Sequence, residues 1–319
     1  MKEVTLNRLT INQRTKAWLT LIRLPFHTVG LFPLTLGMLI AWNLGHSLNW
    51  AVFALGNLAI VLILLVTYLA GEYHDYECDS LNKEFNMFTG GSRVLQAGLL
   101  PRRHALIGTY IAFALAVTIG LIIQFRYDTG PYTIPLGAFG LICGYFYSSR
   151  PFQWAYRGIG EVLIAICYGW LTLNTGYYLQ TGEFALLPSL VSIPIGISIF
   201  LVILINEFPD YQADMAVKKR NLAVRFGRQK MAVLYMVLVT LSLGILFIAL
   251  PYGLPQLAAI LSVLLLPLVV LNLRAISKKG YEQAAALKGL CARTLMLNLG
   301  FTLIYITAFA LAARNTTVK

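Results

Sequence analysis

Residues 49–79 read NWAVFALGNLAIVLILLVTYLAGEYHDYECD. The part from residue 49 to residue 70 carries no charged side chain, and a membrane helix needs about 20 mainly apolar residues. Directly after this run come four acidic side chains, of which Glu72, Asp75 and Asp79 have the spacing i, i+3 and i+7. The stretch therefore predicts a membrane helix that ends in an acidic cluster.

The composition of the whole chain agrees with a membrane protein. Of its 319 residues, 58% are hydrophobic and 12% are charged, and the mean hydropathy is +0.71. A soluble domain usually carries about 25% charged residues, so lipid rather than water is the main solvent here. The net charge of +12 could suggest nucleic acid, but the basic residues lie in short connectors between apolar runs. That placement favours membrane lipids as partners, and no nucleic acid.

Further apolar runs of similar length occur along the chain, and together they predict an all-α, polytopic membrane protein. The nine candidate membrane helices are roughly residues 22–42, 49–70, 104–124, 132–147, 159–179, 185–205, 231–250, 254–273 and 294–313.

The basic residues test this division of the chain. With a cytoplasmic N-terminus, every lysine and arginine except Arg126, Arg314 and Lys319 falls in an inside segment, as the positive-inside rule requires. The inside stretches 71–103 and 206–230 are long, whereas the outside turns are short. We therefore expect an inner (cell) membrane location with the active site facing the cytoplasm.

The acidic motif occurs twice. Residues 207–214 read EFPDYQAD, so Glu207, Asp210 and Asp214 repeat the pattern E-x-x-D-Y-x-x-D at an offset of 135 residues. The two motifs follow the second and the sixth apolar runs. This indicates an internal duplication of a four-helix unit within one domain (1–319), with halves of about 17–150 and 151–319 and one additional helix.

The spacing of the acids indicates what they bind. On a helix, positions i, i+3 and i+7 fall within an arc of roughly 60°, so three carboxylates share one face. No lysine or arginine lies between residues 70 and 82, or between 201 and 217, to neutralise them. Solvated loop acids would explain one such motif. Two copies at matching places favour Mg²⁺, which binds carboxylates together with substrate phosphate oxygens.

Cationic residues near the acids are candidates for diphosphate binding. The run Gly90-Gly91-Ser92-Arg93 offers backbone amides and a guanidinium. Lys83 and Lys218 each follow the last Asp of a motif by four residues, and Lys219 comes next. A third inside loop pairs Tyr147 with Arg150.

These motifs resemble the UbiA superfamily of intramembrane prenyltransferases, over essentially the whole chain. The superfamily's first motif, N-x-x-x-D-x-x-x-D, is matched by Asp75 and Asp79, with Gly71 in place of the Asn. Its second motif is matched by Asn206, Asp210 and Asp214. The superfamily's tyrosine-containing loop is matched by residues 147–150.

Three further stretches resemble the 1,4-dihydroxy-2-naphthoate polyprenyltransferase branch, which makes menaquinone. They are residues 91–94 (GSRV), 156–161 (YRGIGE) and 219–227, whose pattern is K-x-x-L-A-V-R-F-G. The chain departs from that branch at Glu72 and Glu207, where the branch has Asp and Asn, and at Lys218, where it has Gly.

The resemblance implies a reaction and a role for each residue. Mg²⁺-dependent transfer of a polyprenyl group from polyprenyl diphosphate to an aromatic acceptor is expected, with 1,4-dihydroxy-2-naphthoate as that acceptor. The implied metal residues are Asp75, Asp79, Asp210 and Asp214, with Glu72 and Glu207 as further ligands or bases beside them. The implied diphosphate residues are Arg93, Lys83, Lys218, Lys219 and Arg150, and those for the substrate or carbocation are Tyr147, Asn206 and Tyr211.

Other functions stay open at this point. The acceptor could be 4-hydroxybenzoate, a glycerol phosphate or a chlorin. Repeats with intramembrane acids also occur in transporters, although transporter sites usually lie near the midplane of the bilayer. An inactive lipid-binding scaffold is a further alternative.

Overall fold

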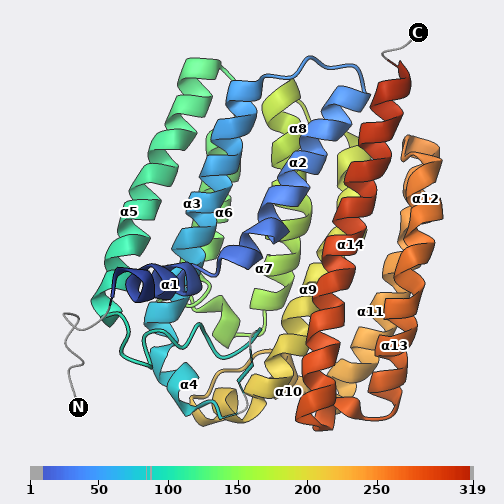
Figure 1. Cartoon of the computed structure of the whole chain (residues 1–319). Coiled ribbons are helices and arrows are strands. Elements are labelled where there is room, and N and C mark those ends of the chain that lie inside the picture. Colours follow the sequence, from blue (N-terminus) through green and yellow to red (C-terminus); the bar gives the residue numbers. More distant parts are fainter. Residues whose placement is uncertain (1–9, 84, 87, 317–319) are drawn as a thin grey trace.

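The computed structural model of the chain describes residues 10–83, 85–86 and 88–316, with side chains as far as Ala313. Every regular element in these residues is a helix, so the predicted all-α class is confirmed. Figure 1 shows long helices lying side by side, with short helices and connectors at the end where the N-terminus lies. The C-terminus lies at the opposite end.

Eight helices in the described part of the chain are long and apolar enough to cross a membrane. They are Ile11–Asn43, Trp50–His74, Arg102–Arg126, Gly160–Thr181, Leu186–Ala216, Arg228–Tyr252, Gln256–Ser277 and Ala284–Ala313.

The remaining predicted span, 132–147, is the shorter helix α6 (Thr133–Phe146). Its 14 residues measure about 21 Å at 1.5 Å per residue, less than the roughly 30 Å of a bilayer core. The polytopic helical fold is thus confirmed. The count of nine spans and the cytoplasmic N-terminus stay predictions.

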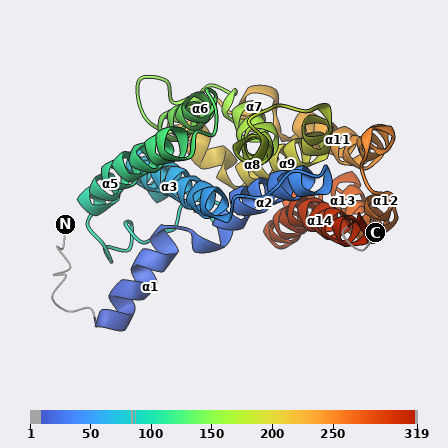
Figure 2. The ribbon, with the colours of Figure 1, turned by 90° about the horizontal axis from the view of Figure 1, so that it is seen from above.

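Several of the eight spans are built from consecutive shorter segments. The first holds α1 (Ile11–Leu21), a 3₁₀ turn and α2 (Thr28–Asn43), and α1 lies crosswise to the bundle and projects from it (Figures 1 and 2). Two spans contain π-helical segments, which break the regular helical repeat. The segments of the third to seventh spans are α5 (Arg102–Leu121), η3 (Ile122–Arg126), α7 (Gly160–Ala165), η5 (Ile166–Leu171), α8 (Thr172–Thr181), α9 (Leu186–Ala216), α11 (Arg228–Ala249), η6 (Leu250–Tyr252), α12 (Gln256–Ser262), η7 (Val263–Leu265) and α13 (Leu266–Ser277).

Seen from above, the bundle has three parts (Figure 2). α5, α6 and α3 (Trp50–His74) lie on one side, and α11 to α14 (Ala284–Thr316) lie on the other. α2, α7, α8 and α9 lie between them.

A close contact between α2 and α8 holds the centre together, and two glycines make it possible. A Cβ on Gly37 would lie 2.0 Å from the carbonyl oxygen of Leu173, and one on Gly176 would lie 2.1 Å from that of Leu34. Small residues let membrane helices approach until their backbones touch. Any side chain at either position would force the two helices apart.

Two long helices carry the acidic motifs to one end of the bundle. α9 has 31 residues, about 46 Å, so it is longer than a bilayer core and its last turns extend past the apolar part. α3 ends at His74, and the short helix α4 (Tyr76–Leu81) continues from it and packs against α9. The segments that bear the two motifs therefore meet.

Gly176→Leu should destabilise the fold by about 1–3 kcal/mol or more, because the new side chain overlaps the α2 backbone. The midpoint of thermal unfolding in detergent measures this. The control is Gly244→Leu on α11, where a Cβ meets no atom within 4 Å. An equal midpoint for both variants would refute the proposed role of the α2–α8 contact.

Candidate functional site

One cavity at the N-terminal end of the bundle is lined by acids from both motifs. Asp75 and Asp79 reach it from the first motif, and Glu207 and Asp210 from the second. Lys219 lines it as well. Residues that are far apart in the sequence thus surround a single space, which we call the acidic cavity.

Asp75 is held by two hydroxyl groups from the connector between α6 and α7. Ser148 Oγ donates to one carboxylate oxygen at 2.6 Å, and the Tyr156 hydroxyl donates to the other at 2.7 Å. Burial and the negative charge of Asp75 raise the pKa of Tyr156, so its hydroxyl keeps the proton that it donates. Both donors fix the direction in which Asp75 faces.

Glu72 is buried, with 3% of its surface exposed, and it is fully engaged. The backbone N–H and the hydroxyl of Ser92 each donate to it at 2.7 Å, and Arg23 Nε lies 3.3 Å from the same carboxylate. Glu72 therefore attaches the 90–92 loop to α3 and positions a guanidinium at the edge of the cavity.

Asp79 lies against the backbone of Gly91. A Cβ at Gly91 would lie 2.2 Å from the Asp79 carboxylate, and its φ of +72° suits glycine. Burial, together with the charges of Asp75 and Glu72, raises the pKa of Asp79 to about 8. Burial and the neighbouring carboxylates thus disfavour the ionised form of Asp79, and a bound cation would favour it.

The two aspartates of the second motif have different surroundings. Asp210 lines the cavity and accepts a hydrogen bond of 2.6 Å from the side chain of Asn82. Asp214, only 1% exposed, instead accepts from Asn221 Nδ2 at 2.6 Å and pairs with Lys219 Nζ at 3.3 Å. Burial lowers the pKa of Lys219, but the carboxylates of Asp214 and Asp75 outweigh it and raise the pKa above its ordinary value. Lys219 is therefore a permanent cation.

Buried acids also anchor the segment that carries Lys219. Glu161 accepts from the backbone N–H of Leu222 at 2.6 Å, and Glu207 from that of Ala223 at 3.2 Å. These are the first amides of the short helix α10 (Leu222–Phe226). The chain therefore leaves α9, presents Lys219 to the cavity and is fixed again immediately afterwards.

Of the three residues predicted to contact the substrate or carbocation, two line the cavity and one does not. Tyr147 and Asn206 line the cavity, and the Asn206 amide oxygen is buried without a hydrogen bond from the described residues. Tyr211 lies outside the lining, with the Arg228 guanidinium 5.3 Å from its ring centre. Three of the predicted diphosphate residues, Lys83, Arg150 and Lys218, have exposed side chains and do not line the cavity.

The Arg93 side chain stabilises the glycine loop by binding backbone carbonyl groups. Its guanidinium donates to the backbone carbonyls of Asp79, Asn82 (3.3 Å) and Gly90 (3.4 Å), and lies 4.0 Å from the centre of the Phe85 ring. It is not among the residues that line the cavity. Its contacts tie the segment after the first motif to the glycine loop.

Several residues at the site were missed or given no role from the sequence. Arg23 counted only as one of the basic residues near the N-terminus, and Asn82 carried no signal. Ser148 adjoins the predicted Tyr147, and Tyr156 and Glu161 lie in a stretch that resembles the naphthoate branch, so a signal existed for these three. Their hydrogen-bond partners depend on how the connectors fold.

The acidic cavity fits a metal that is shared with a substrate. Among the described residues, no three His, Cys, Asp or Glu side chains lie close enough to enclose an ion by themselves. Mg²⁺ commonly uses one or two carboxylates and completes its octahedron with water and phosphate oxygens. The carboxylates of Asp75, Asp79 and Asp210 meet that requirement.

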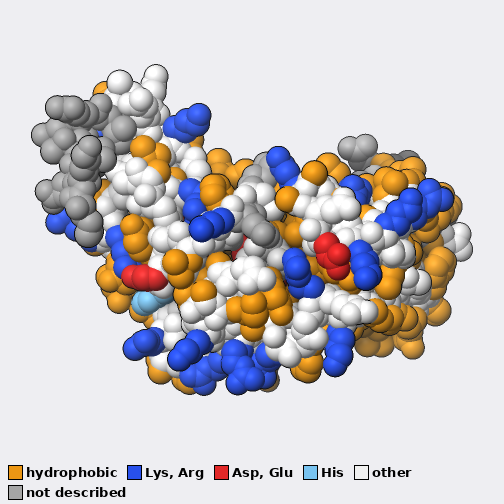
Figure 3. Space-filling view, turned by 90° about the horizontal axis from the view of Figure 1, so that it is seen from below, with side chains coloured by type: hydrophobic (Ala, Val, Ile, Leu, Met, Phe, Trp, Pro, Cys, Tyr) orange, Lys and Arg blue, Asp and Glu red, His pale blue; other side chains and the backbone are white. Residues whose placement is uncertain are grey.

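The surroundings of the cavity favour anions. Figure 3 views this end of the molecule and shows lysine and arginine side chains spread across it, with acidic side chains visible at only a few places. Such a field attracts phosphorylated substrates and anionic lipid headgroups.

The chain is similar to known proteins of one family. Residues 30–300 match the family model described as the UbiA prenyltransferase family. The chain is 26% identical over 214 residues to a 2-carboxy-1,4-naphthoquinone phytyltransferase from Synechocystis, over 66% of each chain. It is also 26% identical over 309 residues to a 1,4-dihydroxy-2-naphthoate octaprenyltransferase from Escherichia coli, over 93% of this chain and 97% of that one.

A solved structure shares the fold. It is a UbiA homolog from Archaeoglobus fulgidus bound to GPP and Mg²⁺, with a TM-score of 0.60 and 14% identity, over 91% of this chain and 99% of that one.

The anchoring of α10 can be tested by proteolysis. Glu161→Ala should leave a buried amide without its acceptor, at a cost of about 1–3 kcal/mol. Trypsin should then cleave at residues 218–220 about five times faster or more, because cleavage follows the population of the opened segment. Glu183→Ala, an exposed glutamate between α8 and α9, is the control. Equal cleavage of both variants would show that Glu161 does not hold this segment.

Proposed function

The chain belongs to the UbiA prenyltransferase family, and we propose that it transfers a polyprenyl group from a polyprenyl diphosphate to 1,4-dihydroxy-2-naphthoate in menaquinone synthesis. One observation carries the proposal. Carboxylates from both acidic motifs line one cavity, together with the protonated amine of Lys219. A cluster of opposite charges at the end of an apolar bundle suits a substrate with an anionic head and a lipid tail.

Asp75, Asp79 and Asp210 would hold Mg²⁺ in this cavity, together with the diphosphate of the donor. The Archaeoglobus homolog, which shares the fold and is bound to GPP and Mg²⁺, supports this assignment. When bound, Mg²⁺ would supply positive charge to the diphosphate as it leaves. Asp214, Glu72 and Glu207 would act indirectly, because they position Lys219, Arg23 and the loops around the cavity.

The bond that breaks joins the allylic carbon of the donor to a diphosphate oxygen, which keeps the electron pair. Lys219 and Arg23 both line the cavity and would stabilise the negative charge that builds on this oxygen. Tyr147 and Tyr168, also in the lining, would offer their rings to the allylic cation and exclude water from it.

A ring carbon of the acceptor would then attack the cation to form the new C–C bond. With 1,4-dihydroxy-2-naphthoate, the ionised carboxylate on that carbon would leave as CO₂, and the electron pair of the broken C–C bond would restore the aromatic ring. The unpaired amide oxygen of Asn206 in the cavity lining could accept a hydrogen bond from an acceptor hydroxyl.

The choice of acceptor rests on the names of the two relatives described above, both of which are naphthoate or naphthoquinone prenyltransferases. The aligned part is about two thirds of the Synechocystis protein, so its activity is proposed here only by analogy. The remaining acceptor candidate of the same aromatic class is 4-hydroxybenzoate. We further propose that the cavity end of the bundle faces the cytoplasm, in agreement with the basic face in Figure 3.

Asp75→Asn and Asp210→Asn should each lower prenyl transfer by about 100-fold or more, because each removes a charge that the transition state needs. The assay follows labelled polyprenyl diphosphate with purified protein, 1,4-dihydroxy-2-naphthoate and Mg²⁺. Glu77→Gln is the matched control: it lies in the first motif but is exposed and pairs with Arg102 at 2.7 Å. Asp variants as active as this control would exclude the proposed mechanism.

The acceptor is tested in cells. A strain without this protein should lose menaquinone and keep other prenylated quinones, as measured by mass spectrometry of its lipids. Purified protein should prenylate 1,4-dihydroxy-2-naphthoate in preference to 4-hydroxybenzoate in a mixture of the two. Preference for the second acid would reject the naphthoate assignment and keep the prenyl transfer.

A further inference from the structure

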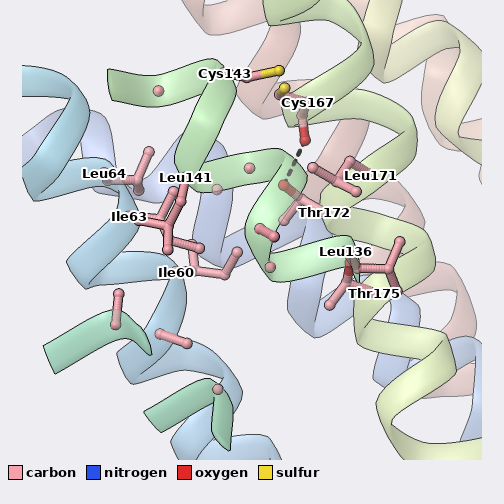
Figure 4. Close-up of a pocket in the computed structure, with 18 of the residues that line it drawn as sticks. Ile60, Ile63, Leu64, Leu136, Leu141, Cys143, Cys167, Leu171, Thr172 and Thr175 are labelled. Carbon is pink, nitrogen blue, oxygen red and sulfur yellow. Dashed lines mark hydrogen bonds between the residues drawn. The ribbon is translucent and has the colours of Figure 1, made fainter. Parts of the chain in front are cut away.

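A groove on the surface of the bundle lies between the crosswise helix α1 and the first turns of α5. Helix α1 contributes Arg14 and Trp18 to its lining. The other lining residues are Leu100, His104, Ile107, Gly108 and Ile111. We call this space the α1–α5 groove. None of these residues lines the acidic cavity, or the apolar space among α3, α5, α6 and α8 whose wall is drawn in Figure 4. The groove is therefore a separate site.

The polar side chains of the groove lie beside one tryptophan. Arg14 and Trp18 are four residues apart on α1, so they share a face of that helix. The Trp18 ring stacks on the His104 ring, with 6.2 Å between the ring centres. A guanidinium donates several N–H groups to phosphate oxygens, and an imidazole donates at least one whether it is neutral or protonated. This part of the groove therefore suits an anionic phosphate group.

The apolar part of the groove follows α5. Ile107 and Ile111 come three and seven residues after His104, so the three share one face of the helix. The two isoleucines are 52% and 56% exposed. Helix α5 runs from the end of the bundle where α1 lies toward the opposite end (Figure 1), and Ile111 lies about 10 Å further along it than His104. A ligand with its head beside Trp18 can thus lay an apolar chain along α5.

Helix α1 has the character of a helix that lies at a membrane surface. It crosses the bundle at the end where lysine and arginine side chains gather (Figures 1 and 3). All 11 of its residues are described, and only Ala17 and Leu21 are buried in the protein. By contrast, Ile11 and Leu19 are 81% and 46% exposed. Exposed aliphatic side chains, a tryptophan and basic residues together favour a position at the level of the lipid headgroups.

We propose that the α1–α5 groove binds an anionic phospholipid, with its phosphate beside Arg14 and His104 and one acyl chain along α5. The described lining contains no carboxylate. A prenyl diphosphate fits less well for that reason, because the Mg²⁺ that accompanies a diphosphate would find no ligand there. A zwitterionic lipid also fits less well, because its ammonium group would find no counter-charge in the lining. This site does not depend on the proposed function.

The bound lipid would hold α1 against the bundle. Arg23 follows the end of α1 closely, and its backbone N–H donates to the carbonyl of Thr20 at 3.1 Å. The Arg23 side chain lines the acidic cavity and pairs with Glu72 at 3.3 Å. The position of the last turn of α1 therefore sets where this guanidinium enters the cavity. Occupation of the groove would stabilise the segment that delivers it.

Lipid binding is measured by native mass spectrometry of the purified full-length protein in detergent. The added lipid is phosphatidylglycerol, or a phosphatidylcholine with the same acyl chains. Wild-type protein should bind one phosphatidylglycerol about tenfold more tightly than the phosphatidylcholine, and Arg14→Gln should lose that preference, because a charged hydrogen bond is removed. Lys16→Gln is the matched control, since Lys16 is also a cation of α1 but is exposed and lies outside the groove. Equal lipid preference in the two variants would overturn the proposal.

Hydrogen exchange tests whether the lipid holds α1. At a concentration ten times its dissociation constant, phosphatidylglycerol should slow amide exchange in residues 14–22 about tenfold in wild-type protein and in Lys16→Gln. It should leave exchange in Arg14→Gln unchanged. Equal slowing by phosphatidylcholine would reject the anionic site. Slowing by glycerol phosphate, which lacks acyl chains, would identify a site for free phosphate. Displacement of the bound lipid by polyprenyl diphosphate would identify a donor site, and each of these results would overturn the proposal.

Discussion

A carboxylate that lies at the end of a membrane helix must receive hydrogen bonds or a counter-charge, because leaving it without either is costly. This requirement connects the two halves of the molecule. Asp75 receives its hydrogen bonds from Ser148 and Tyr156, beyond α6 in the chain, and Asp210 receives one from Asn82, which follows the first motif. Each motif is therefore stabilised by residues from another part of the sequence. The acidic cavity is the space that these contacts enclose.

Repetition in sequence does not mean repetition of role. The last aspartate of the first motif, Asp79, borders the cavity, whereas its counterpart Asp214 is buried against Lys219 and Asn221. The first half lines the cavity with three carboxylates, those of Glu72, Asp75 and Asp79. The second half lines it with two, those of Glu207 and Asp210, and with the cation Lys219. This difference suits a substrate whose head needs both metal ligands and positive charge.

The sequence predicts the helices and the meeting of the motifs better than it predicts individual contacts. Apolar runs located the spans because lipid imposes composition and length, although α6 came out shorter than a bilayer core. Arg93 was expected at the diphosphate, but the structure uses its guanidinium to bind loop carbonyls. Arg23 pairs with Glu72 across 49 residues of sequence. Such pairings depend on how irregular connectors fold, for which periodicity and charge give no rule.

The central claim is that carboxylates of both motifs hold divalent ions around one diphosphate. The most direct test is an anomalous-scattering map of crystals grown with Mn²⁺, as a substitute for Mg²⁺, and an unreactive thio-analogue of the donor. The account predicts metal peaks about 2 Å from oxygens of the first-motif aspartates and of Asp210, with the diphosphate between them. A diphosphate bound only by Lys219 and Arg23, with no metal peak beside the carboxylates, would contradict it.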